Sequence, residues 1–173
     1  FHFLVQALQE GGASQLIYNM NCRNDVPGYG YQLAKGATAL TESWPALAEV
    51  SNNHLMLGHI MEWFYNGLAG IQQAENSVAY RDIIIRPEVV GDITHVKATY
   101  QIPDGTILSE WELKNQHFTL HVNIPPHTNA SIKIPATPSQ SITENGKLIK
   151  PVHYENGRAT VRICPGEYEF SVN

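Results

Sequence analysis

Positive charge and cysteine are both scarce in this sequence of 173 residues. Eleven Lys and Arg residues stand against 16 Asp and Glu residues, which gives a formal net charge of −5, and the basic residues form no run. Nucleic acid is therefore not expected as a partner, because a phosphate backbone is bound by clustered positive charge. The two cysteines, Cys22 and Cys164, lie far apart without Cys or His neighbours at metal-ligand spacing. They predict neither a disulfide framework nor a zinc site, and they leave the compartment open.

Long apolar runs are missing as well. The richest segment, residues 55–71, is interrupted by His59, Glu62 and Asn66. A membrane-spanning helix needs about 18 uninterrupted apolar residues, so no membrane span is expected. Charged residues make up only 16% of the chain and hydrophobic residues 43%, a balance that favours a folded core over disorder.

Charged residues and prolines are unevenly distributed along the chain. Residues 1–74 contain seven charged residues and two of the ten prolines, whereas residues 75–173 contain 20 charged residues and the other eight prolines. We interpret this change as a domain boundary. The sequence predicts a helical domain over residues 1–76 and a β-domain over residues 77–173.

The first part has the apolar spacing of helices. Two such stretches on either side of Gly11-Gly12 predict an αα-hairpin. A third helix is expected to begin after the capping residues Ser51-Asn52-Asn53 and to run to Gly70. Its apolar side chains surround the axis almost completely, so it needs neighbours on all sides.

Three helices cannot supply those neighbours. Phe3, Leu4, Leu55 and Trp63 would each leave apolar surface uncovered, which monomeric proteins seldom tolerate. We therefore expect residues 1–74 to be the end of a larger helical assembly, the rest of which precedes Phe1. The chain by itself is expected either to self-associate through these exposed helices or to be disordered over its first 50 residues.

The second part alternates between apolar and polar residues with period two. About eight short strands follow one another, with Asn145-Gly146 and Asn156-Gly157 as hairpin turns. This pattern predicts an antiparallel β-sandwich. Alternation places Trp111 on the same face as Ile107 and Leu113, which favours its burial.

A long connection, residues 26–53, is the best candidate for a functional site. Connections of this length are uncommon in compact domains and are often functional. It is rich in aromatic residues and glycine, and Glu42 stands two residues before Trp44. Sugars stack their C–H faces on aromatic rings and need a few placed polar groups, so this composition suits a sugar site.

Specific runs carry a resemblance to a known family. Residues 36–44 (GATALTESW), 51–54 (SNNH) and 62–71 (EWFYNGLAGI), together with Gly58, resemble the end of the catalytic domain of bacterial α-L-rhamnosidases, glycoside hydrolase family 78. Residues 85–87 (IRP), 105–107 (GTI) and 124–125 (IP), with Trp111, resemble the C-terminal β-domain of the same proteins. The resemblance covers essentially the whole chain.

The resemblance implies an α+β multidomain fold in which helices from the end of an incomplete (α/α)6 barrel precede the sandwich. It also implies inverting hydrolysis of terminal α-L-rhamnosyl residues, in which one carboxyl group protonates the leaving oxygen and a carboxylate activates water. Glu42 matches the family's general base. Nothing in residues 1–173 matches the motif of the general acid, so the chain is expected to be inactive alone. No cofactor and no metal are expected.

The substrate implied by the resemblance is a rhamnose-containing oligosaccharide or glycoside. His54 stands where the family places a histidine that lines the sugar pocket. Trp44, Tyr29 and Tyr31 are aromatic candidates for the same pocket, as is usual for sugar sites.

Two other interpretations stay open. One is a non-catalytic carbohydrate-binding β-sandwich with a helical extension, which would need an exposed aromatic platform such as Trp111. The other keeps the (α/α)6 barrel but changes the sugar, because a fold does not determine a substrate.

Overall fold

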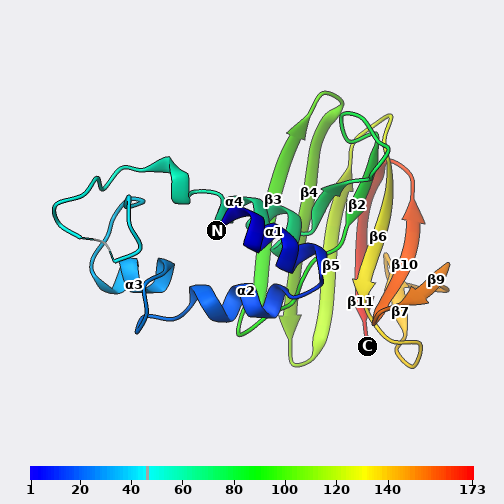
Figure 1. Ribbon diagram of the computed structural model, residues 1–173. Coiled ribbons are helices and arrows are strands. Elements are labelled where there is room, and N and C mark those ends of the chain that lie inside the picture. Colours follow the sequence, from blue (N-terminus) through cyan, green and yellow to red (C-terminus); the bar gives the residue numbers. More distant parts are fainter. Residues whose placement is uncertain (46) are drawn as a thin grey trace. The chain divides into compact units, whose positions relative to one another are not determined.

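Figure 1 shows the computed structural model, which describes residues 1–45 and 47–173. The chain forms two compact units, Phe1–Trp63 and Phe64–Asn173. The first unit holds most of the helices and the second holds two β-sheets. Helices followed by a sandwich of mostly antiparallel sheets are the predicted α+β class. The division between the units lies before the predicted domain boundary at residues 76–77.

The first unit begins with the predicted helical hairpin. It consists of α1 (His2–Glu10) and α2 (Ser14–Asn21). Gly12 between them has a φ of 72°, a left-handed conformation that glycine adopts easily after a helix. Val5 from the first helix and Ile17 from the second are both buried. The predicted αα-hairpin is therefore confirmed.

A helix that the sequence did not predict, α3 (Tyr29–Ala34), lies inside the long connection. Glycine and tyrosine are weak helix formers, so propensity does not favour a helix here. The helix packs closely against the preceding chain, since a Cβ on Gly30 would lie 2.4 Å from the carbonyl oxygen of Arg23. On its other side, Gln32 is buried. Tertiary packing therefore overrides weak propensity here.

The single third helix predicted up to Gly70 is wrong. Three short segments replace it: the 3₁₀ helix η1 (Leu55–Leu57), α4 (Ile60–Trp63) and the π-helix η2 (Phe64–Leu68). The amide of Gly58 donates to the carbonyl of Leu55 (2.8 Å), three residues back, and that of Ala69 donates to Phe64 (3.0 Å), five residues back. The hydrogen-bond spacing thus changes along the segment, which apolar periodicity does not reveal.

The apolar side chains of the first unit are only partly covered. Phe3 and Leu55 are 81% and 84% exposed, and Leu4 is also exposed, as expected. Trp63 differs from the expectation because it is buried, and its indole N–H donates to Ser14 Oγ (3.0 Å). Trp63 therefore has its partners within the unit itself.

The second unit is a sandwich of eleven strands, more than the eight expected. One sheet has the spatial order β1 (Ile71–Gln73), β2 (Asp82–Ile85), β6 (Asn129–Pro135), β10 (Arg158–Ile163), β9 (His153–Glu155). The other has the order β3 (His95–Ile102), β4 (Gly105–Lys114), β5 (His117–Ile124), β11 (Gly166–Val172), β7 (Ile142–Glu144), β8 (Lys147–Ile149). Pairing is antiparallel except between β2 and β6, which are parallel.

Period-two alternation places the core between the sheets. In β4 and β5 alternate residues are buried, among them Ile107, Trp111 and Leu120. Trp111 is 0% exposed, as its alternation predicted, and its indole N–H donates to the carbonyl of Leu68 (2.7 Å). The hydroxyl of Ser109 donates to the carbonyl of Ala69 (2.7 Å). These two bonds fasten the end of the π-helix to the centre of a sheet.

The predicted hairpin turns are present. Asn145-Gly146 joins β7 to β8 and Asn156-Gly157 joins β9 to β10, with positive φ at all four residues. Two consecutive positive φ values are the signature of a tight type I′ turn. Among the described residues, no helix combines the length and the apolar character needed to cross a bilayer.

Candidate functional site

Glu42 lies at the closed base of a loop in the first unit. Its amide donates to the carbonyl of Ser51 (2.8 Å), and the amide of His54 donates to the carbonyl of Leu40 (2.8 Å). Residues 40–42 and 51–54 therefore run beside each other. In return, the amide of Ser51 donates to Oε2 of Glu42 (3.2 Å). The carboxylate is thus oriented by the backbone across the loop.

The surroundings of Glu42 are open. The side chain is exposed. Glu42 lines none of the three cavities described below, which are formed by residues that the structure describes. A general base needs contact with a water molecule and an oriented carboxylate. The Glu42 carboxylate is open to solvent and accepts one backbone hydrogen bond, and the described residues of this unit build no enclosed pocket around it.

Two of the predicted aromatic residues come together. The rings of Trp44 and Tyr29 are 5.0 Å apart at 89°, and Phe1 lies 5.0 Å from Trp44 and 5.9 Å from Tyr29. Edge-to-face contacts at these distances are favourable. His59 joins this aromatic cluster through Phe1, with ring centres 5.0 Å apart.

The hydroxyl of Tyr29 is already used inside the unit. It donates a hydrogen bond to the carbonyl of Leu57, and burial raises the pKa of Tyr29 to about 12. Tyr31, two residues further along α3, is half-buried, and Nζ of Lys35 lies 5.3 Å from its ring centre, a cation–π contact. His54 is half-buried and immediately precedes η1.

No sequence pattern singles out Gln32 and Thr41, the buried polar pair beside Glu42. Gln32 and Thr41 are 3% and 0% exposed. Nε2 of Gln32 donates to Oγ1 of Thr41 (2.7 Å), and Oγ1 of Thr41 donates to the carbonyl of Ser43 (2.6 Å). The only signal was indirect, because Thr41 and Ser43 flank Glu42 in the run that carries the resemblance.

A cavity of about 330 Å³ lies at the same loop. Residues 35–39 form most of its wall, and Ala48 and Asn52 complete it. Gly36 in this wall has a φ of 82°, which favours glycine. This cavity involves part of the run that resembles the rhamnosidase catalytic domain.

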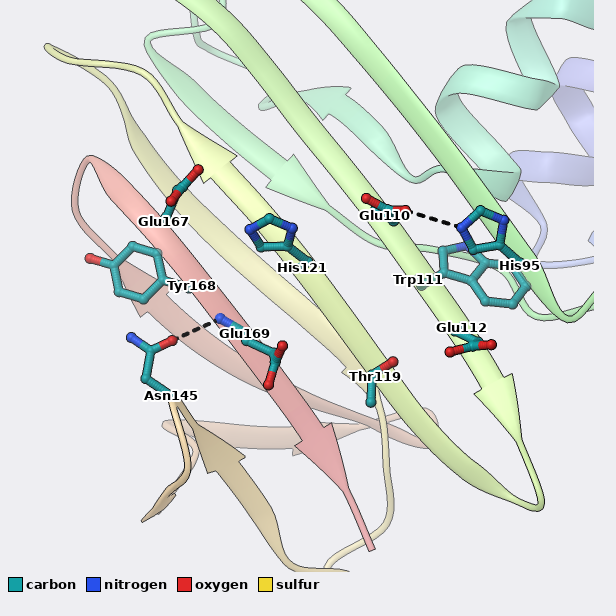
Figure 2. Close-up of a pocket in the computed structure, with 10 residues that line it drawn as sticks. All are labelled: His95, Glu110, Trp111, Glu112, Thr119, His121, Asn145, Glu167, Tyr168 and Glu169. Atoms are coloured by element: carbon teal, nitrogen blue, oxygen red, sulfur yellow. Dashed lines mark hydrogen bonds and ion pairs between the residues drawn. The ribbon is translucent and has the colours of Figure 1, made fainter.

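Two larger grooves lie on the sandwich. One, about 770 Å³, runs over the outer face of β2, β6 and β10 and carries both Lys133 and Arg162. The other, about 680 Å³, lies over β3, β4, β5 and β11, where Figure 2 shows Glu110, His121 and Glu169 on three neighbouring strands. The described groove residues with carboxylate side chains are Glu110, Glu112, Glu167 and Glu169.

We call the groove over β3, β4, β5 and β11 the acidic groove, and ion pairs lie on one side of it. Nζ of Lys97 lies 2.8 Å from Oε2 of Glu110, and Nε2 of His95 lies 3.2 Å from Oε1. These hydrogen bonds hold the pKa of Glu110 below its ordinary value, and the bond from Lys97 has the larger effect. His121 stands in register between Glu110 and Glu169. Within residues 1–45 and 47–173, no cluster of His, Cys, Asp and Glu could hold a metal ion.

Both units match family models of known proteins. Residues 1–68 match the family model of the bacterial α-L-rhamnosidase six-hairpin glycosidase domain. Residues 70–148 match that of the bacterial α-L-rhamnosidase C-terminal domain. Both models describe domains of bacterial α-L-rhamnosidases, and they match this chain in consecutive order.

Individual relatives agree with the family models. An α-L-rhamnosidase of Formosa agariphila is 32% identical over 96% of this chain, which spans 19% of that protein. The structure of Streptomyces avermitilis α-L-rhamnosidase complexed with L-rhamnose superposes with a TM-score of 0.88 at 28% identity, over 98% of this chain and 17% of that one. An α-L-rhamnosidase from Dictyoglumus thermophilum, 24% identical, shows the same fold with a TM-score of 0.89 over 98% of this chain and 20% of that one.

The chain spans about a fifth of the length of these relatives. Within that span residues 1–68 correspond to the family's six-hairpin domain and residues 70–148 of the sandwich to the C-terminal domain. This chain therefore belongs to the bacterial α-L-rhamnosidase family of glycoside hydrolases.

Proposed function

We propose that this chain contributes the general-base loop of an inverting α-L-rhamnosidase, with Glu42 as the base. The observation that carries the proposal is the position of Glu42, whose carboxylate is exposed to water and oriented by the amide of Ser51 at 3.2 Å. Glu42 also lies in the run that resembles the family's catalytic domain.

In this mechanism Glu42 takes a proton from a water molecule as that water attacks the anomeric carbon of rhamnose. A second carboxyl group protonates the glycosidic oxygen on the opposite face of the sugar. The two carboxyl groups of inverting enzymes are roughly 6.5–9.5 Å apart, which leaves room for the water. The second group is expected to come from outside residues 1–173, so this chain alone lacks half of the catalytic pair.

The aromatic residues then take different roles. Trp44 is proposed as a surface for the C–H face of the sugar, and His54 as a hydrogen-bonding group for a rhamnose hydroxyl. Tyr29 packs edge-to-face against Trp44, and its hydroxyl donates to the carbonyl of Leu57. We therefore propose that Tyr29 holds Trp44 in place and does not contact the sugar. Tyr31 stays a candidate for sugar contact.

Replacing Glu42 tests the assignment. In the full-length protein we expect Glu42→Gln to lower kcat for an aryl α-L-rhamnoside by about 100- to 10,000-fold, since the amide cannot accept the proton of water. KM should change little. Glu49→Gln, an exposed carboxylate in the same connection, is the matched control and should keep normal kcat. Near-normal turnover by Glu42→Gln would remove Glu42 from the mechanism.

The alternative interpretations differ in their tests. A carbohydrate-binding sandwich would need an exposed aromatic platform, and its main candidate, Trp111, is buried. A barrel enzyme for another sugar would hydrolyse an aryl glycoside other than the α-L-rhamnoside. Comparing kcat/KM over a panel of aryl glycosides separates these cases, because the proposal requires the α-L-rhamnoside to have the highest value.

A further inference from the structure

The buried amide of Gln32 needs an explanation beyond packing. Glutamine is rarely buried, because its amide must be hydrogen-bonded once it leaves water. At 3% exposure, Gln32 sits on a six-residue helix that propensity hardly supports. An apolar residue of similar length would fill the same space without the need for partners. The position of the amide's partners therefore suggests what it does.

Those partners lie on both sides of Glu42. Nε2 of Gln32 donates to Oγ1 of Thr41 at 2.7 Å and to the carbonyl of Ser43 at 3.3 Å. Oγ1 of Thr41 closes the triangle by donating to the same Ser43 carbonyl at 2.6 Å. The residues before and after Glu42 are thus held by one buried side chain.

A second set of bonds holds Glu42 from the far side of the loop. The amide of Glu42 donates to the carbonyl of Ser51 at 2.8 Å, and the amide of Ser51 donates to the carboxylate at 3.2 Å. The carboxylate is exposed, so its orientation depends on the position of the Glu42 backbone. Buried hydrogen bonds are stronger than exposed ones and hold that backbone more rigidly.

We infer that Gln32 and Thr41 are positioning residues, which form a buried brace that fixes the direction of the Glu42 carboxylate. This inference rests on the proposed role of Glu42 as general base. Misplacing a catalytic group by about 1 Å lowers the rate by about 100-fold, because the reacting atoms no longer meet in the required geometry. The brace is thus expected to act on kcat rather than on substrate affinity.

Two substitutions of Thr41 separate positioning from stability. Thr41→Val keeps the volume but removes the hydroxyl, whereas Thr41→Ser keeps the hydroxyl and removes a fully buried methyl group. In the full-length protein we expect Thr41→Val to lower kcat by about 10- to 100-fold with KM within about twofold. Thr41→Ser should keep near-normal kcat although it unfolds at a lower temperature than the wild type.

Gln32→Met tests the other half of the brace, since it preserves length and removes all hydrogen bonds. It should lower kcat to a similar extent as Thr41→Val. Gln6→Met is its matched control, because Gln6 is exposed on α1 and bonds only Glu10 among the described contacts (3.2 Å); its kcat should not change. If Gln32→Met fails to fold, the Thr41 pair still decides.

The outcomes distinguish this inference from the proposed function. Loss of kcat in Glu42→Gln with normal kcat in Thr41→Val would overturn the brace and leave the base in place. Equal loss of kcat in Thr41→Val and Thr41→Ser would also overturn it, since activity would then follow packing. Normal kcat in Glu42→Gln would overturn the proposed function itself.

Discussion

Arg158 is the most heavily engaged charged residue of the sandwich. Its Nη2 lies 2.9 Å from Oε2 of Glu88, and its Nη1 donates to the carbonyls of Pro87 (2.9 Å) and Lys133 (3.1 Å). Both ion-pair side chains are 13% exposed. Burial lowers the pKa of Arg158, and the charge of Glu88 opposes that shift. The guanidinium thereby fastens residues 87–88 to two strands of the sheet.

Removing this guanidinium leaves the buried Glu88 carboxylate with one arginine partner instead of two, because Nη1 of Arg86 lies 3.2 Å from its Oε1. We expect Arg158→Met to lower the free energy of unfolding by about 1.5 to 3 kcal/mol, measured by urea denaturation, because a buried charge-assisted hydrogen bond is lost while Arg86 still offsets the charge of Glu88. Adding Glu88→Gln should recover part of the loss, because the double variant no longer buries a carboxylate that lacks one of its two arginine partners. Arg162→Met, on the same strand but exposed, serves as control. A loss no larger than that of Arg162→Met would contradict the importance of the pair.

At the scale of elements, the passage from the π-helix into β1 depends on Gly70. Its φ is 74°, and a Cβ at this position would lie 2.2 Å from the carbonyl carbon of Arg86. The carbonyl of Gly70 accepts a hydrogen bond from the amide of Arg86 (2.8 Å). The glycine thus serves two needs, a left-handed conformation and the close approach of two backbone segments.

A matched pair of glycines separates these needs. Gly157 has a similar φ of 71° with nothing within 4 Å of its Cβ position. Gly157→Ala should therefore cost only the left-handed strain, about 1 to 2 kcal/mol. Gly70→Ala should lower the free energy of unfolding by at least about 2 kcal/mol more, because backbone atoms must move. Equal losses in urea denaturation would show that the segments are not tightly packed at Gly70.

At the scale of the whole molecule, uncovered apolar side chains are concentrated in the first unit. Phe3 and Leu55 are more than four-fifths exposed, and Leu33 is 72% exposed. Burial of apolar surface contributes about 25 cal/mol per Å², so such side chains favour contact with another surface. Together with the expected absence of the general acid, this leads to one joint prediction for the isolated chain.

We expect residues 1–173, purified alone, to self-associate with rising concentration and to show no turnover of an aryl α-L-rhamnoside. Sedimentation velocity and a rhamnosidase assay on the same sample measure both properties. The double variant Phe3→Ser/Leu55→Ser should weaken the association. Leu148→Ser, which removes an equally exposed residue from the sandwich (72%), should not. A monomer at all concentrations, or clear turnover, would contradict the respective half of the prediction.

Patterns local in the chain were sufficient for much of the architecture. Period-two alternation from His95 to Val172 predicted most of the sandwich strands and the burial of Trp111. The two Asn-Gly pairs marked their turns because asparagine and glycine adopt paired positive φ values more readily than most residues. The runs around Glu42 and Trp63 identified the family, which the comparisons confirm. The role of Glu42 stays a prediction.

The tertiary structure alone decided the features that depend on partners distant in sequence. The π-helix η2 ends where the carbonyl of Leu68 accepts the hydrogen bond of Trp111, 43 residues later. The parallel pairing of β2 with β6 joins segments that no local pattern connects. Gln32 is interpretable only once Thr41 and Ser43 lie beside it. The physical reason is the same in each case: periodicity and turn propensity are set by neighbours along the chain, whereas burial of a polar group depends on which hydrogen-bond partners the fold brings to it.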